Sequence, residues 1–198
     1  MCSIIGYKGK FQPELVKKLL YNSRIRGLHA FGYSFYQNKE LTTRKFLDYK
    51  LFEQSICEEK PDLFVAHFRY STSGDYKVID NNQPLQQNNV CIAFNGVISQ
   101  KTKEEIEKEY QVVLKNDNDG YLLIQKLNDV DFLSNKNISF AFVGLELHRL
   151  FFMRNEKRPL HLFESDDLKV VASTKDIIQR SGIENSVLLK SNKLYFYD

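Results

Sequence analysis

The sequence predicts one α+β domain in which antiparallel sheets are layered against helices. Strand-like segments come in hairpin-sized pairs between isolated helices, which favours antiparallel sheets over a doubly wound parallel sheet. The 198 residues fall within the size of one domain, so residues 1–198 are expected to form a single unit. Hydrophobic residues make up 42% of the chain and include 15 Phe and 11 Tyr, which is ample material for a packed core.

In the first part of the chain, short apolar segments alternate with two helical patterns. Pro13 suits the first position of a helix, leucines then recur at helical spacing, and Gly27 is expected to end the helix. Strands and a turn are recognised from β-branched and aromatic runs bounded by polar residues. The expected elements are a strand over 3–9, a helix over 12–27, a hairpin over 30–49 turning at 37–39, a short helix over 51–60 and a buried strand over 63–71.

The second part begins with a polar loop over residues 73–89, and long loops in compact domains are often functional. Thr102 and Glu105 have the spacing of a capping box and announce a helix. The other expected elements are a strand pair or a strand and turn over 89–99, a helix from about Asp119, strands within 138–155, 160–173 and 186–198, and a helix over 174–182.

Composition argues against several classes of protein. Basic residues exceed acidic ones by only 28 − 25 = 3 and are scattered, whereas a nucleic-acid surface is usually concentrated. The odd cysteine count and the lack of a C-x-x-C pair argue against a disulfide framework and a cysteine zinc site. No signal peptide and no apolar run of about 18 residues is present, so a cytoplasmic protein without a membrane segment is expected. Cys57 and Cys91 are expected to be buried thiols.

The opening stretch MCSIIGYKG allows two interpretations of Cys2. Free cysteine is often buried, so Cys2 can be the first buried residue of an N-terminal strand. Alternatively, removal of Met1 exposes Cys2 as a residue with a thiol and a free α-amine, which is a nucleophile that carries its own base. This stretch alone favours the first interpretation.

His67 and Arg69 stand in the apolar segment VAHFRYSTSG. A buried arginine needs a partner, because an unpaired charge in the core is costly. The partner can be a structural Asp or Glu, or a ligand carboxylate that accepts two hydrogen bonds from the guanidinium. His67 is expected to be a core residue whose hydrogen bonds are satisfied.

Two further polar features have both a structural and a chemical interpretation. Asn95 and Gly96 form the strongest hairpin-turn dipeptide, yet an Asn amide beside a Gly N–H can also stabilise an oxyanion. Asp117 and Asp119 precede a helix, where carboxylates are favoured by capping and the macrodipole, but a carboxylate there can also hold an ammonium group.

Taken together and in order, these segments resemble a known family. Cys2 is followed by RGLHAFG, HFRYSTSG, NQP, FNGVIS and NDGYLL, and later by RNEKRPLHLF and VVASTKDII. This series resembles the motifs of the class II glutamine amidotransferases, which are N-terminal-nucleophile hydrolases, over nearly the whole chain. The resemblance implies a four-layer αββα sandwich with two antiparallel sheets, and it implies no cofactor and no metal.

The resemblance implies a catalytic role for several residues. Cys2, exposed by removal of Met1, would attack the side-chain amide of L-glutamine and form a thioester. Asn95 and Gly96 would form the oxyanion hole. Arg26 and Gly27 match a position that supports the site from behind.

It also implies a set of substrate contacts. Arg69 would bind the α-carboxylate of glutamine with help from Thr72, and Asp119 would bind the α-ammonium group. Tyr70 lies where the family often carries a large aromatic residue near the substrate. Asp117 remains an alternative to Asp119.

The chain departs from the family pattern at three places. Ser3 stands where Gly is usual, His29 stands where Asp is common, and NDGYLL differs from the usual ammonium-binding motif. The expected function is a glutaminase that releases ammonia for a separate synthase or ligase subunit. Two alternatives stay open, namely a catalytically silent relative that binds glutamine or acts as a scaffold, and a hydrolase for another amide. The oligomeric state is not predicted.

Overall fold

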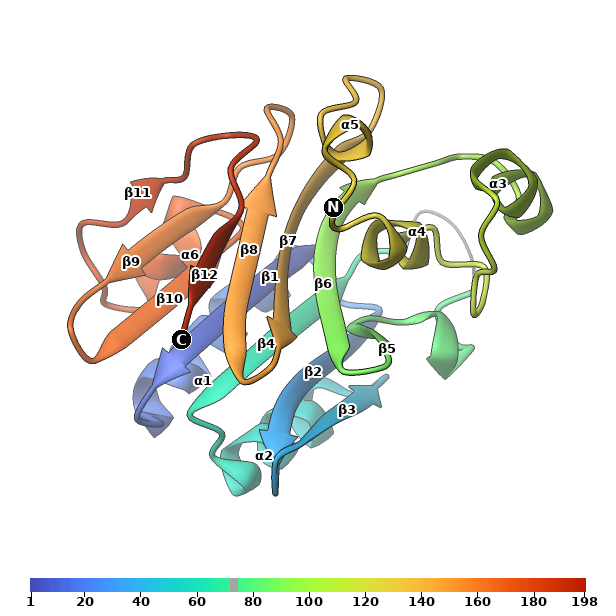
Figure 1. Cartoon of the computed structure of the whole chain (residues 1–198). Coiled ribbons are helices and arrows are strands. Elements are labelled where there is room, and N and C mark those ends of the chain that lie inside the picture. Colours follow the sequence, from blue (N-terminus) through green and yellow to red (C-terminus); the bar gives the residue numbers. More distant parts are fainter. Residues whose placement is uncertain (72–74) are drawn as a thin grey trace.

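A computed structural model describes residues 1–71 and 75–198, and its strands form two antiparallel sheets (Figure 1). The seven-stranded sheet has the order β11-β9-β10-β1-β4-β2-β3 and the five-stranded sheet the order β12-β8-β7-β6-β5. The first sheet contains β1 (Ser3–Gly9), β2 (Ala30–Gln37), β3 (Glu40–Phe46), β4 (Leu63–Arg69), β9 (His161–Glu164), β10 (Leu168–Ala172) and β11 (Val187–Leu188). The second contains β5 (Leu85–Gln87), β6 (Val90–Val97), β7 (Ser139–Glu146), β8 (Arg149–Arg154) and β12 (Tyr195–Tyr197).

Helices cover the outer face of each sheet. One outer layer consists of α1 (Pro13–Arg24), α2 (Tyr49–Glu59) and α6 (Lys175–Arg180), and the other of α3 (Lys103–Tyr110), α4 (Gly120–Gln125) and α5 (Val130–Leu133). A short 3₁₀ helix, η1 (Ile79–Asn81), lies in the loop before β5. None of the helices in the described ranges is long and apolar enough to cross a membrane.

Three separate clusters of buried side chains define the layers. Ile4, Val65 and Val143 belong to the cluster between the two sheets, whereas Leu19 and Phe52 belong to the cluster that joins the first sheet to its helices. A third cluster joins β6, β7 and β8 to α3, α4 and α5. The α+β class and the four-layer αββα arrangement predicted for the chain are therefore confirmed.

The central strand β1 places the N-terminus beside the end of β4. Because side chains alternate along a strand, Ile4 faces the other sheet and Ile5 faces the helices. The antiparallel register pairs Ser3 with Phe68 and Ile4 with His67. Cys2, one residue before β1, consequently lies next to the carboxyl end of β4.

Most predicted elements are present, with small differences at their ends. The first helix ends at Arg24, three residues before Gly27, and Pro13 occupies its first turn. Asp48 caps α2 by accepting a hydrogen bond from Leu51 N at 3.0 Å, so this helix begins two residues earlier than expected. The capping box of Thr102 and Glu105 is present in α3.

The turn interpretation of Asn95 and Gly96 is wrong. Both residues continue β6, where they pair with Ala141 and Phe140 of β7. A Cβ atom at Gly96 would lie 1.8 Å from the carbonyl oxygen of Ser139, so this glycine permits close strand contact rather than a turn. The helix α5 and the short strand β5 were not predicted, because each has too few residues to show a period.

Candidate active site

A cavity of about 630 Å³ opens where the N-terminus, the end of β4 and the end of β6 meet. Of the predicted site residues in the described ranges, Cys2, Arg69, Tyr70, Gly96 and Asp119 line it. Its remaining lining comes from His67, Ser71, Asn81, Gln83, Phe94, Val97, Ser99, Gln100, Lys101, Thr102, Lys103, Glu104, Asp117 and Asn118.

Cys2 lies outside β1 and is only partly covered, so it is not the first buried residue of the strand. Its Sγ lies 3.8 Å from the carbonyl oxygen of Tyr70, and its own carbonyl accepts a hydrogen bond from Arg26 Nε at 3.3 Å. Burial of the thiol is the main influence on the pKa of Cys2 and raises it, while the positive charges of Arg69 and Arg158 act in the opposite direction. The thiol is therefore protonated near neutral pH and needs a base to become a nucleophile.

Arg69, at the end of β4, is almost completely buried. Its Nη1 donates to the carbonyl oxygen of Asn81 at 2.8 Å and to Oδ1 of Asn82 at 2.7 Å. The Asn82 side chain is itself fully buried and donates through Nδ2 to the carbonyl of Tyr76 at 2.8 Å. Asn82 therefore holds both the loop and the guanidinium, a role that the sequence did not reveal although Asn82 is the first residue of the NQP segment.

Asp119 precedes α4, but its carboxylate turns toward the end of β6. Oδ2 accepts hydrogen bonds from Ile98 N at 2.7 Å and Ser99 N at 3.0 Å. Burial raises the pKa of Asp119, and these backbone hydrogen bonds act against that rise. Asp119 therefore occupies the N-cap position of α4 without a side-chain capping hydrogen bond, and Gly120 N donates instead to Oδ1 of Asn118 at 3.0 Å.

Asp117 lines the same cavity but is exposed. Asp119 is partly covered and held in place by two backbone N–H groups, which fixes the direction of its carboxylate. Of the two carboxylates, only Asp119 is thus positioned by the fold itself in the part of the chain that the structure describes.

Asn95 is 2% exposed, and its Nδ2 finds no hydrogen-bond partner among the described residues. It lies between Phe94 and Gly96, both of which line the cavity. Gln83 fixes this part of β6, since its Oε1 accepts a hydrogen bond from Phe94 N at 2.7 Å. An unpaired buried amide donor is costly, and Asn95 does not itself line the cavity, although both of its neighbours in β6 do.

Arg26 and Gly27 lie behind Cys2 and β4. Arg26 contacts the Cys2 carbonyl as described above, and a Cβ atom at Gly27 would lie 2.3 Å from the carbonyl oxygen of Phe68. Only glycine lets the chain pass this close to the end of β4. The supporting role predicted for both residues stays a prediction.

Tyr70 lies at the rim of the cavity and is about half exposed. Its ring stacks on the His29 ring with 5.0 Å between the ring centroids, and His29 also stacks on Tyr76 with 4.9 Å between the centroids. His29 Nδ1 accepts a hydrogen bond from Ser71 N at 2.9 Å. The unusual His29 therefore supports the residues that follow Arg69. Thr72, expected to help Arg69, lies outside the described residues.

His67 is a buried residue of β4, as expected, but its hydrogen bonds are not satisfied. It lines the cavity beside the Phe94 backbone, and neither ring nitrogen makes a hydrogen bond of normal geometry with the described residues. Burial and the charge of Arg69 lower the pKa of His67 to about 3, so its ring is neutral at physiological pH. No group of three or more His, Cys, Asp and Glu in the described ranges is placed to hold a metal ion.

The other two cysteines lie away from this cavity. Cys91 is fully buried, as predicted, whereas Cys57 is partly exposed, which the sequence did not predict. Burial raises the pKa of Cys91 to about 12, so its thiol does not ionise near neutral pH.

No protein-family model matches this chain, and no curated protein sequence matches it either. Solved structures do match. The glutamine phosphoribosylpyrophosphate (PRPP) amidotransferase from B. subtilis has a TM-score of 0.76 and 20% identity over 98% of this chain and 47% of its own. A structure described as the allosteric regulatory enzyme of purine biosynthesis has the same TM-score and identity, with 98% and 46% covered. The chain thus spans about half the length of these two proteins.

A third structure is closer in length. The glutamine aminotransferase class-II domain protein from Silicibacter pomeroyi has a TM-score of 0.63 and 13% identity over 98% of this chain and 94% of its own. These identities are low, so the matches concern the fold. This chain has the sandwich fold of the N-terminal-nucleophile hydrolases and shares it with solved glutamine amidotransferase structures, as the order of its motifs predicted.

Proposed function

We propose that this chain is a glutaminase of the class II glutamine amidotransferase type, with Cys2 as the nucleophile after removal of Met1. The observation that carries the proposal is that Cys2, Arg69 and Asp119 line one cavity. A thiol, a buried cation and a positioned carboxylate are the three groups needed to bind an α-amino acid and attack its side chain. Arg69 would bind the α-carboxylate, and Asp119 the α-ammonium group.

The proposed base is the α-amine that removal of Met1 would expose on Cys2. A free α-amine has a pKa of about 7.7 to 8.0, so a useful fraction is neutral near pH 7. Arg26 Nε donates to the Cys2 carbonyl oxygen at 3.3 Å, and the charge of Arg158 acts on the Cys2 thiol, so both cations lie near this residue. Their positive charges would lower the pKa of the amine and increase its neutral fraction.

The reaction would run in two steps. The amine takes the thiol proton, directly or through a water, and the thiolate attacks the side-chain amide carbon of glutamine. The carbon–nitrogen bond then breaks, and the α-amine gives its proton to the leaving nitrogen. This step releases ammonia and leaves a γ-glutamyl thioester. Water then cleaves the thioester, which gives glutamate and restores the thiol.

Asn95 and Gly96 would stabilise the negative oxygen that forms in both steps. The unpaired, buried Nδ2 of Asn95 supports this role, because its interaction would be gained only when the oxyanion forms. Thr72 would assist Arg69 in holding the substrate, and Tyr70 would cover one side of it.

The ammonia would be used by a separate synthase or ligase. The B. subtilis PRPP amidotransferase is about twice as long as this chain, which supports an acceptor domain outside the described sandwich.

The first experiment is an intact-mass measurement and N-terminal peptide map of the purified protein, before and after treatment with a glutamine-like diazo-ketone. The proposal expects Met1 to be absent and a single adduct on Cys2. The Cys57→Ser variant should label normally, whereas Cys2→Ser should not. A processed protein that binds glutamine but neither reacts nor releases ammonia would instead identify a silent glutamine-binding relative.

A further inference from the structure

A second cavity, of about 520 Å³, is lined by Ile79 and Asp80 of η1, whereas Asn81 of the same helix lines the candidate active site. The residues that line it are Thr43, Lys45, Ile79, Asp80, Pro84, Gln86, Asn88, Lys115 and Tyr121. It shares none of these with the cavity that contains Cys2. Its volume lies within the usual range for small-molecule sites, about 300 to 1,000 Å³.

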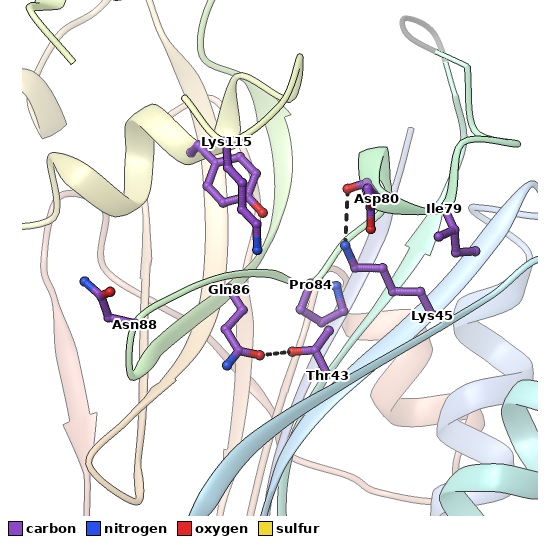
Figure 2. Close-up of a pocket in the computed structure, with 9 residues that line it drawn as sticks. Thr43, Lys45, Ile79, Asp80, Pro84, Gln86, Asn88 and Lys115 are labelled. Carbon is purple, nitrogen blue, oxygen red and sulfur yellow. Dashed lines mark hydrogen bonds between the residues drawn. The ribbon is translucent and has the colours of Figure 1, made fainter. Parts of the chain in front are cut away.

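Two ammonium groups face this cavity from different parts of the chain. Lys45 comes from β3 and Lys115 from the segment between α3 and α4, and Figure 2 shows both side chains directed into the same space. Lys45 Nζ donates to the carbonyl oxygen of Asp80 at 3.2 Å. In the described part of the chain, neither lysine forms an ion pair with a carboxylate.

The positive charge of Lys45 is incompletely compensated. Burial is the main reason why its pKa is lowered to about 8; Lys115 and Arg69 lower it further, and Asp80 acts in the opposite direction. Lys45 is still largely protonated at pH 7, so a partly desolvated ammonium group remains at the wall. An anionic ligand in the cavity would compensate the cost of desolvating this ammonium group.

The rest of the wall combines fixed polar groups with small exposed parts of two rings. Gln86 Oε1 accepts from Thr43 Oγ1 at 2.7 Å, and Gln86 Nε2 donates to the Leu41 carbonyl at 3.1 Å, so this amide is held in place (Figure 2). Pro84 and Tyr121 also line the cavity, but both are buried, so only small parts of their rings are exposed there. Such a wall can hold the carbon body of a ligand while the lysines bind its charged group.

We infer that this cavity binds a small phosphorylated molecule, with its phosphate between Lys45 and Lys115 and its body against Pro84 and Tyr121. A phosphate monoester carries a charge of about −1.5 to −2 at pH 7, which matches two ammonium groups. Lysine binds phosphate as a point charge, whereas planar carboxylates are better matched by the fork of an arginine. The site does not depend on the chemistry proposed for Cys2.

The test is isothermal titration calorimetry of the full chain with AMP, inorganic phosphate, adenosine and citrate. AMP is expected to bind, inorganic phosphate to bind more weakly at the same site, and adenosine and citrate to give no measurable binding. Lys115→Gln should weaken AMP binding about tenfold, the energy of one good charged contact, and the Lys45→Gln/Lys115→Gln double variant should abolish it.

Lys50→Gln is the matched control, because Lys50 is exposed on α2 and outside the cavity. It should bind AMP as the unmodified chain does. Lys115 is also exposed, so its loss does not threaten folding. Affinity for AMP should fall as pH rises from 7 to 9, because Lys45 loses its proton near pH 8 while the phosphate stays dianionic. Binding of AMP that is unchanged in Lys115→Gln, equal binding of citrate or adenosine, or no AMP binding at all would each overturn the inference.

Discussion

The Nη1 atom of Arg69 donates a 2.7 Å hydrogen bond to Oδ1 of Asn82, and Asn82 is fully buried. This bond connects the end of β4 to the loop before β5, which are 13 residues apart in sequence. In the proposed mechanism Arg69 binds the glutamine carboxylate. Asn82, which does not contact the substrate, therefore fixes the direction of a substrate-binding group.

Asn82→Ala should lower both the stability of the fold and its affinity for glutamine. Loss of the side chain removes the hydrogen bonds to the Tyr76 carbonyl and from Arg69 Nη1, which costs about 1 to 3 kcal/mol in the free energy of unfolding. In the active protein, the KM for glutamine should rise more than kcat falls. Urea denaturation and ammonia-release kinetics measure these effects. Asn22→Ala, which removes an amide on α1, is the control and should leave KM unchanged.

Asn95→Ala should reduce glutamine hydrolysis by about 10²- to 10³-fold in kcat, the usual cost of losing one oxyanion donor. The fold should tolerate the change well, because Nδ2 of Asn95 has no partner among the described residues. Single-turnover assays and thermal unfolding separate the two effects. A nearly normal rate would exclude Asn95 from the oxyanion hole.

Gly96→Ala serves as the contrasting variant. Its Cβ would lie 1.8 Å from the Ser139 carbonyl oxygen, so β6 and β7 would have to move apart. This variant should lose stability as well as activity, whereas Asn95→Ala should lose activity alone.

The three thiols should differ sharply in reactivity. Burial raises the pKa of Cys91 to about 12, so iodoacetamide at pH 8 should leave Cys91 unmodified until the chain is unfolded. Cys57 is partly exposed and burial raises its pKa, so it should react slowly at pH 8 and faster as the pH rises. Peptide mapping after timed alkylation gives all three rates. Rapid labelling of Cys91 in the folded protein would contradict its buried position.

The fold was predictable because local signals and packing agree along most of the chain. Both faces of β1 are apolar, with Ile4 on one face and Ile5 on the other. The capping box of Thr102 and Glu105 marks the start of α3 in the sequence. The order of the motifs also predicted the sandwich. In that fold Cys2, Arg69 and Asp119 line one cavity although they are far apart in sequence.

Other features depend on contacts between distant residues and leave no local pattern. Asn95 and Gly96 have the composition of a turn, but pairing with β7 keeps them in a strand. Asp119 has the position of a helix cap, but its carboxylate accepts hydrogen bonds from the N–H groups of Ile98 and Ser99, about 20 residues earlier in the chain. The role of Asn82 likewise follows only from the folded position of Arg69.

His67 should make the fold sensitive to acid. Its folded pKa of about 3 lies below the ordinary value of 6.5, so the unfolded chain binds more protons between these two values. The neutral ring therefore contributes full stability above pH 6.5, and that contribution is lost as the pH falls toward 3. Between pH 7 and pH 5 this residue should account for about 2 kcal/mol of the free energy of unfolding.

Urea denaturation at pH 7 and pH 5 measures this effect in the unmodified chain and in His67→Gln. The variant should lose about 2 kcal/mol less than the unmodified chain over this interval. His148→Gln, at an exposed position, should keep the original dependence. An equal loss in all three proteins would show that other groups cause the acid sensitivity.

The segment between the two cavities should couple them. The carbonyl of Asp80 accepts from Lys45, and the carbonyl of the next residue, Asn81, accepts from Arg69. A phosphorylated ligand bound to Lys45 and a glutamine bound to Arg69 act on the same segment, so each ligand should raise the affinity of the other. With the Cys2→Ala variant, which binds without turnover, AMP is expected to tighten glutamine binding by about fivefold or more.

Linkage makes this last prediction a strict one, because glutamine must then tighten AMP binding by the same factor. Calorimetry of each ligand in the presence and absence of the other measures both factors in one protein. Lys115→Gln, introduced into the Cys2→Ala background, should weaken AMP binding while leaving the affinity for glutamine alone unchanged, since Lys115 lines only the second cavity. If both ligands bind and neither changes the affinity of the other, the segment from Asp80 to Asn82 is a rigid wall, and Arg69 is held in its position whether or not the second cavity is occupied.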